Sequence, residues 1–217
     1  MSVLHSSFSL RGVNFRNRIF VSPMCQYSCQ DGYVNDWHLV LLGSRAIGGA
    51  GLVMAEATAV NPVGRISPAD AGIWTDAHAE AFHPIARFIR QHGAVPAIQL
   101  AHAGRKASSE IPWRKIRPLT PEEGGWNVVG PSAIPFAPDN PVPAELSASE
   151  IAVLVREFAD AAKRSVAAGF EVIEIHMAHG YLLHEFLSPL SNQRRDDYGG
   201  DFDGRIRFPL EVAAAVR

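Results

Sequence analysis

The sequence predicts an α/β fold, a TIM (β/α)8 barrel of which these 217 residues hold only the N-terminal half or slightly more. Short apolar runs alternate with amphipathic helical stretches, a pattern typical of parallel strands that are covered on both faces. The Gly-x-Gly-x-x-Gly turn that a doubly wound Rossmann sheet needs after its first strand is absent. Polar and aromatic residues follow the predicted strands, where barrels keep their chemistry.

The predicted strands and helices alternate along the chain. We expect strands at 18–22, 51–57, 95–100 and 170–175, and helices at 36–46, 76–92 and 147–168. Ser147 and Glu150 have the spacing of a capping box, and Gly169 follows the last predicted helical residue. Pro84 indicates either a kink in the second helix or a helix that begins there. The glycine-rich stretch 48–51 precedes a strand and is interpreted as a tight turn.

Residues 107–146 interrupt this alternation after the third strand. They contain eight prolines and the pair Gly124-Gly125, which is too much proline for a helix. We therefore predict a long proline-rich loop insertion. A long ordered loop at the active face of a barrel usually forms a lid or a substrate wall.

The number of strands indicates an incomplete barrel. A closed barrel needs eight strands and typically about 250 residues, whereas four strand–helix units are predicted here, the last of which reaches Arg217 inside a helix. Half a barrel would leave two open parallel edges. We therefore expect 1–217 to be the N-terminal portion of a longer protein.

Composition restricts the classes of partner. The chain is 47% hydrophobic and 19% charged, which is ordinary for a globular protein. A formal charge of −2 gives no electrostatic reason to expect nucleic acid or a membrane surface as partner. We see no signal peptide and no apolar run near the roughly 20 residues of a membrane span. Two cysteines, Cys25 and Cys29, are too few for a disulfide framework, so we expect a reducing, cytoplasmic location.

His176, His179 and Tyr181 follow the fourth predicted strand. Two imidazole donors and a phenol could hold the carbonyl oxygen of an electron-poor substrate and deliver a proton. The residues alone leave two other interpretations open. The histidines could be structural, or they could bind a metal with an acid such as Glu56 in a barrel lyase, although the H-E-x-x-H motif is absent. Cys25 taken alone would be a small buried apolar residue.

The chain resembles the Old Yellow Enzyme family of flavin-dependent ene-reductases, in the bacterial branch of xenobiotic reductases and thermophilic-type enzymes with an active-site cysteine. The similarity covers essentially all of the chain, and its motifs lie at every predicted strand end. The matching stretches are SPMCQY (22–27), EATAV (56–60), QLAHAGRK (99–106), HMAHGYLLHEFLSPLSN (176–192) and DDYGG (196–200).

The resemblance implies that 1–217 is part of a barrel domain with FMN at its carboxyl face. In this family a reduced nicotinamide, NADPH more often than NADH, provides hydride that reaches the β-carbon of an α,β-unsaturated carbonyl compound, or a nitro compound or quinone. The small-molecule substrate is not specified by the sequence. The resemblance implies flavin contacts for six residues: Ser22, Pro23, Met24, Cys25, Ala57 and Gln99.

For the substrate, the resemblance implies that His176 and His179 donate hydrogen bonds to the carbonyl oxygen and that Tyr181 protonates the α-carbon. Tyr27 and Lys106 are expected in the substrate pocket. The flavin-phosphate site of the family comes from the last barrel strands, which this sequence lacks. We therefore expect 1–217 alone to bind FMN weakly or not at all, with an inactive fragment as the alternative. Homo-oligomers are common in this branch, but no residue here identifies an interface.

Overall fold

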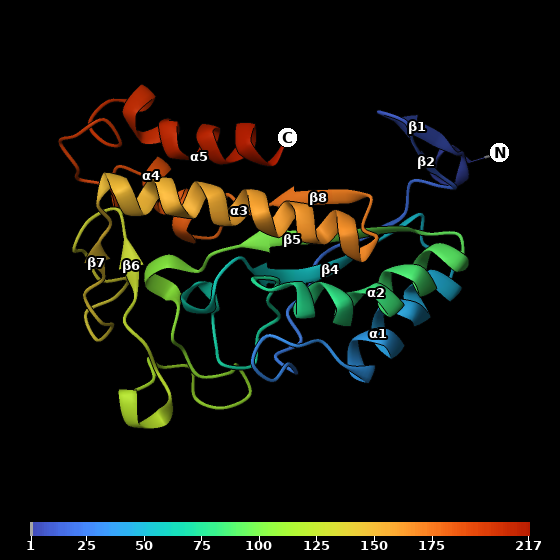
Figure 1. The fold of residues 1–217 in the computed structure, drawn as a ribbon, viewed down its shortest axis with the longest axis horizontal. Helices are drawn as coiled ribbons and strands as arrows, with labels where there is room; N and C mark the ends of the chain where they lie inside the picture. Colours follow the sequence, from blue (N-terminus) through green and yellow to red (C-terminus); the bar gives the residue numbers. More distant parts are fainter. Residues whose placement is uncertain (1) are drawn as a thin grey trace.

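A computed structural model describes residues 2–217, and its centre is a four-stranded parallel sheet in the order β3-β4-β5-β8 (Figure 1). Each strand pairs in parallel with the next, so all four carboxyl ends meet at one edge of the sheet. The strands are β3 (Phe20–Val21), β4 (Leu52–Ala59), β5 (Val95–Ala101) and β8 (Val172–Ile175).

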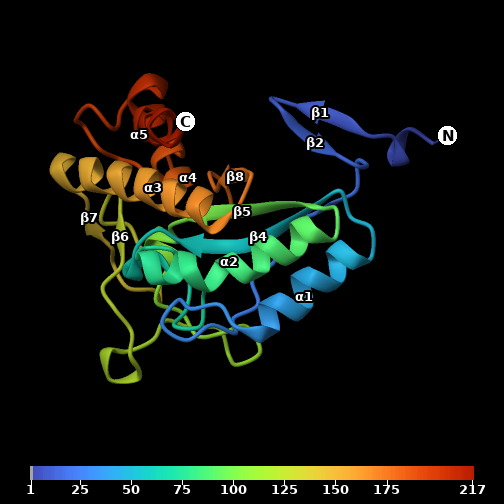
Figure 2. The same ribbon diagram turned by 45° about the vertical axis from the view of Figure 1, so that its right-hand side comes forward.

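Four helices follow one another beside the sheet: α1 (Asp36–Ile47), α2 (Asp76–Gln91), α3 (Ala148–Ala168) and α5 (Phe202–Val216). Figure 2 shows α1, α2 and α3 side by side along it, and α5 contacts α3. The predicted capping box of Ser147 and Glu150 is present at the start of α3. Helix α2 runs through Pro84 without interruption, so the alternative that a helix begins there is wrong.

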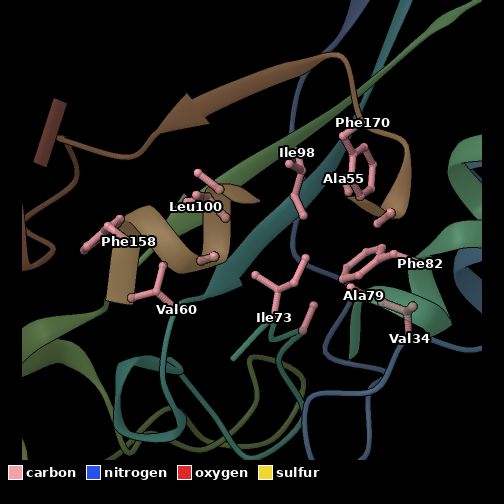
Figure 3. Packing of buried hydrophobic residues seen from close by; sticks show 14 of the residues in the cluster. Val34, Ala55, Val60, Ile73, Ala79, Phe82, Ile98, Leu100, Phe158 and Phe170 are labelled. Carbon is pink, nitrogen blue, oxygen red and sulfur yellow. The ribbon is translucent and has the colours of Figure 1, made fainter. Parts of the chain in front are cut away.

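The main core lies between the sheet and these helices. Ile98 and Leu100 of β5 pack there with Phe82 of α2 and Phe158 of α3 (Figure 3). Because side chains alternate along a strand, residues at intervening positions of β4 and β5 face the other side of the sheet. Near their amino ends these residues form a second cluster: Leu52, Met54, Val95 and Ala97, packed with Phe15.

Phe15 belongs to an antiparallel hairpin that the sequence did not predict, formed by β1 (Phe8–Leu10) and β2 (Val13–Phe15). Its ring stacks on that of Phe8, with centroids 4.8 Å apart, and also contacts Phe20 at the start of β3. Figure 1 shows the hairpin at the end of the sheet away from the arrowheads. The hairpin therefore covers the amino end of the second face.

Residues 107–146 connect β5 to α3 by a largely irregular path. The segment contains a 3₁₀ helix, Pro121–Glu123, and two short strands, β6 (Val129–Gly130) and β7 (Ala144–Glu145), which pair in parallel. The buried Arg194 donates to the carbonyl oxygens of Pro131 (3.0 Å) and Leu146 (2.6 Å). Arg194 thereby fastens this segment to the loop that precedes α5.

The other predictions agree with the structure to within a few residues at element ends, although β3 has only two of the five residues expected. Gly48 ends α1 and Gly49 has a φ of +101°, which confirms the predicted tight turn at 48–51. A short helix, α4 (Leu182–Leu187), was not predicted. Both cysteines carry free thiols. Within residues 2–217, no helix combines the length and apolar character needed to cross a membrane.

Candidate active site

His176 follows β8 directly and has a defined tautomer. Its Nδ1 accepts the N–H of Ala178 at 3.2 Å, so the proton of the neutral ring lies on Nε2, which can donate to a ligand. Burial lowers the pKa of His176, and the nearby His179 lowers it further. With 6% of its surface exposed, the imidazole is a neutral hydrogen-bond donor at neutral pH.

His179 and Tyr181 are brought to His176 by a reversal of the chain. His179 has a φ of +57° and Gly180 a φ of +71°, both in the left-handed region, which is uncommon for a residue other than glycine. The ring centroid of His176 lies 5.0 Å from that of His179 and 4.8 Å from that of Tyr181. We call these three side chains the His-His-Tyr cluster. The structure therefore brings together the three predicted catalytic residues.

The phenol of Tyr181 remains protonated far above neutral pH. Burial raises the pKa of Tyr181 well beyond its ordinary value, and electrostatic interactions with Cys25 and Asp70 add to that effect. Burial likewise raises the pKa of Tyr27, whose ring packs edge-on against Trp113 at 5.6 Å. Both phenols are available as neutral donors.

Cys25 lies between β3 and α1 in a loop that a buried acid holds. Glu56 accepts the backbone N–H of Gln26 at 2.9 Å through one carboxylate oxygen, and its other oxygen lies 3.1 Å from His38 Nε2. Burial raises the pKa of the Cys25 thiol to about 12, with further contributions from Asp70 and Glu56. Cys25 is therefore a thiol rather than a thiolate at neutral pH.

The partners of Glu56 also bear on the lyase alternative. Its carboxylate is engaged by His38 and Gln26 rather than by His176 and His179. Among residues 2–217, no three His, Cys, Asp or Glu side chains are arranged so that they could hold a metal ion. The donor set that the lyase interpretation requires is not assembled.

The predicted flavin contacts lie at the carboxyl edge of the sheet. Ala57 is paired with Gln99 across β4 and β5, and Gln99 is paired with Glu174 of β8. The Gln99 amide donates to the carboxylate of Glu174 at 2.5 Å. A small side chain on β4 beside an amide on β5, with a neutral thiol in the loop that follows β3, fits a flat heteroaromatic ring with N–H and carbonyl groups at its edge.

Ser22, Pro23 and Met24 precede Cys25 in the same loop, and the Met24 side chain is 53% exposed. This exposure leaves Met24 available for a ligand. It also means that Met24 makes little contribution to the core.

A cavity of about 460 Å³ lies beside the cluster. Tyr27, Tyr181 and Lys106 line one part of it, and Phe136 with residues between 109 and 118 of the proline-rich segment lines another. Its size and mixed lining suit a small organic molecule. Tyr27, Lys106 and Tyr181 therefore share one cavity with this segment, whereas His176 and His179 are not among the residues that line it.

Two buried acids near this site were missed from the sequence. Asp70 accepts from the Ile66 N–H and the Ser67 hydroxyl, and burial raises its pKa to about 7. Glu185 belongs to α4 and is 1% exposed. A signal for Glu185 was present, because Glu185 and His184 are the two polar residues of the run 182–187, whose other members are apolar.

The parallel strands, the helices beside them and the cluster at their carboxyl edge define a part of a β/α barrel with a group of polar side chains at its carboxyl face. The family described as "NADH:flavin oxidoreductase / NADH oxidase family" matches residues 4–217, and the chain belongs to this family.

Related proteins support this family assignment. An NADH:flavin oxidoreductase of Gibberella zeae is 52% identical over 213 residues, which are 96% of this chain and 52% of that protein. An NADPH dehydrogenase of Geobacillus thermodenitrificans is 48% identical over 218 residues, covering 100% of this chain and 60% of that protein. The chain thus spans between about half and three fifths of the length of these relatives.

Solved structures show the same fold. Morphinone reductase superposes with a TM-score of 0.86 at 29% identity, covering 98% of this chain and 58% of that one. An Old Yellow Enzyme from a Pichia species gives a TM-score of 0.85 at 26% identity over 99% of this chain and 56% of that one. The family resemblance inferred from the sequence is confirmed, and the fold corresponds to part of a TIM barrel.

Proposed function

We propose that the protein is an FMN-dependent ene-reductase in which hydride from NADPH or NADH reaches the β-carbon of an α,β-unsaturated carbonyl compound. Nitro compounds and quinones are further substrates of this proposal. The observation that carries it is the His-His-Tyr cluster, which stands at the carboxyl edge of the sheet in a member of a flavin oxidoreductase family. Because the chain spans only part of its relatives, the proposal concerns the whole protein.

In this proposal, the histidines act on the carbonyl oxygen. Addition of hydride to the β-carbon moves negative charge onto that oxygen. The Nε2–H of His176 and the ring of His179 would donate to it, and donors aimed at a developing charge stabilise the transition state more than the ground state. The neutral His176 does so without a charge of its own.

Tyr181 would complete the reaction by giving its phenolic proton to the α-carbon. A phenol that remains protonated is a suitable general acid for a carbon that carries developing negative charge. Tyr27 and Lys106 line the same cavity and would shape the substrate pocket. The proline-rich segment would form its outer wall and shield the substrate from water.

FMN would be held by Ser22, Pro23, Met24, Cys25, Ala57 and Gln99. When bound, FMN supplies the two-electron redox chemistry that none of the protein side chains can supply. The Gln99 amide would hydrogen-bond the edge of the flavin ring. The loop before α1, held by Glu56, would lie against the face of the ring.

The test is an absorption spectrum of the purified full-length protein, recorded without oxygen before and after NADPH is added. We expect flavin bands that bleach with NADPH and return when cyclohexenone is added. Tyr181→Phe and His176→Ala should slow the return of colour and leave the bands in place. A colourless protein that FMN cannot reconstitute would refute the proposal. The same spectrum of residues 1–217 would show whether this part binds FMN by itself.

A further inference from the structure

Three hydrogen bonds join the loop that follows β5 to the loop and helix that follow β8. The first is between backbones, from Leu182 N–H to the His102 carbonyl oxygen, at 2.9 Å. The second runs from the backbone N–H of Arg105 to Oε1 of Glu185, also at 2.9 Å. In the third, the Lys106 ammonium donates to the His179 carbonyl oxygen at 2.9 Å.

The second and third bonds lie on neighbouring residues of one short turn, Gly104–Lys106. The Glu185 carboxyl group accepts a hydrogen bond from this turn, and Lys106 of the same turn donates one to the backbone of His179. We name this chain of contacts, from Glu185 through the turn to His179, the clasp. We propose that the clasp keeps His179 in its left-handed conformation, and that Glu185 is a positioning residue for the His179 imidazole although it touches no substrate. The inference rests on the function proposed above.

The burial of Glu185 argues for a role beyond stability. A carboxyl group inside a protein opposes folding unless hydrogen bonds compensate it. Oε1 has the Arg105 N–H, but Oε2 has no hydrogen-bond partner within residues 2–217. An apolar side chain at this buried position would avoid that penalty. The acid is therefore costly where it stands, and the bond it accepts is the contact that an apolar residue could not replace.

The turn and the carboxyl group are fitted to each other. Gly104 has a φ of +59°, and a Cβ atom at this position would collide with the Glu185 carboxyl group. Gly130 of β6 faces the other carboxylate oxygen, which would lie 3.2 Å from an added Cβ. Two positions without side chains thus leave room for the acid, one in the turn and one in the proline-rich segment.

The position of Lys106 links the clasp to the cluster. Its ammonium lies 4.8 Å from the centre of the Phe136 ring and 5.2 Å from that of Tyr181, so aromatic faces limit where it can move. The carbonyl it holds belongs to His179, whose left-handed backbone persists only where the surroundings determine it. Release of that carbonyl would let the backbone relax and would redirect the imidazole.

The experiment is a double-mutant cycle in the full-length, FMN-loaded protein, with kcat/KM for cyclohexenone as the readout. Glu185→Met removes the acceptor at similar length, Lys106→Met removes the ammonium, and Glu185→Gln keeps an acceptor oxygen. We expect each Met variant to lose about tenfold or more, the double variant to lose no more than the worse single one, and Glu185→Gln to stay within about threefold of the parent. Glu171→Met is the matched control, because Glu171 lies in the exposed ion pair with Arg90 at the other end of the sheet.

A second readout does not depend on activity. The ¹³Cα and ¹³Cβ chemical shifts of His179 report its backbone conformation. They should change in Glu185→Met and in Lys106→Met but not in Glu185→Gln. Unchanged His179 shifts in Lys106→Met would overturn the inference, as would losses of kcat/KM that simply add in the double variant.

The outcomes also separate this inference from the function on which it rests. A parent protein that reduces no enone contradicts the proposed function, and the chemical shifts of His179 then decide the clasp alone. A parent that reduces enones, with Lys106→Met equal to it, contradicts only the clasp. If Glu185→Met does not fold, the comparison of Lys106→Met with Glu185→Gln decides by the same criteria.

Discussion

The two ends of the parallel sheet are lined by different kinds of side chain. At the amino end, aromatic rings of the hairpin stack on one another and on the first residues of the strands. At the carboxyl end, acids, an amide and histidines are buried with specific hydrogen bonds. The amino end therefore stabilises the sheet by apolar packing. At the carboxyl end, polar groups are buried at a cost in stability, and this burial fixes their positions. This division is the rule in β/α barrels.

The largest effect should come from the amino end. Phe15 is 3% exposed and joins the hairpin to Leu52 and Val95. Phe15→Ala should lower the free energy of unfolding by about 3–5 kcal/mol, because a buried aromatic ring is replaced by a cavity. Denaturant titration of the full-length protein checks the loss. The kcat/KM of the folded fraction of the variant should match that of the parent. A large loss of kcat/KM would mean that packing at the amino end also determines the geometry of the site.

At the carboxyl end we expect a substitution to reduce activity strongly and to change stability little. Tyr181→Phe removes one hydroxyl group and should reduce kcat/KM for cyclohexenone about 10²–10³-fold, because the general acid is lost. The midpoint of thermal unfolding should stay within a few degrees of the parent. Steady-state kinetics and a thermal melt of the same preparation give both numbers. Retained activity would assign the proton to another donor.

A polar residue at the amino end offers a sharper comparison. The Arg16 guanidinium donates to the carbonyl oxygens of Ala46, Ala50 and His92. These carbonyls lie in the last turn of α1, in the turn that follows α1, and at the C-terminal end of α2. Arg16→Met should cost about 1–3 kcal/mol of stability, because buried carbonyl groups lose a charged donor. Activity should not change. A catalytic defect in Arg16→Met would show that polar groups at this end also serve the site.

The smallest step in stability, taken per unit of pH, is expected from the ionisation of Glu185. Burial raises the pKa of Glu185 to about 8, while the hydrogen bond from the Arg105 backbone and the charges of Arg105 and Lys106 oppose the shift. Since the folded protein keeps this proton when the unfolded chain has lost it, the free energy of unfolding should fall between about pH 4.5 and pH 8. The contribution of one such group is at most about 1.4 kcal/mol for each pH unit.

Glu185→Gln should remove this contribution. Denaturant titrations of the parent and the variant at several pH values should give two curves that diverge from about pH 4.5 and become parallel above about pH 8. Curves that are parallel throughout would mean that Glu185 ionises normally. Asp70, with a pKa raised to about 7 by burial, adds a similar slope to both proteins and cancels in the comparison.

Local signals made much of the fold predictable. Ser147 and Glu150 cap α3 as their spacing indicates, and the strand that leads to His176 could be found from its apolar residues. The hairpin could not be found, because its strands have three residues each and are stabilised by rings that meet only in the folded chain.

The same distinction between signals within one stretch of sequence and contacts between distant residues applies to the site. His176, His179 and Tyr181 are close in sequence, so one motif reveals them. Glu185 is different, because its partner Arg105 lies 80 residues earlier in the chain. Glu56 was linked to the wrong histidines in the lyase alternative, since its true partner His38 becomes its neighbour only when α1 packs on β4.

The left-handed backbone of His179 has a consequence for mutagenesis. Alanine at this position would report two losses together, the imidazole and the greater tolerance that histidine has for a positive φ. Asparagine accepts this conformation more readily than alanine and keeps a polar side chain. A substitution library at position 179 should therefore be ranked by backbone tolerance first and by side-chain chemistry second. His179→Asn is the cleaner probe of what the imidazole does.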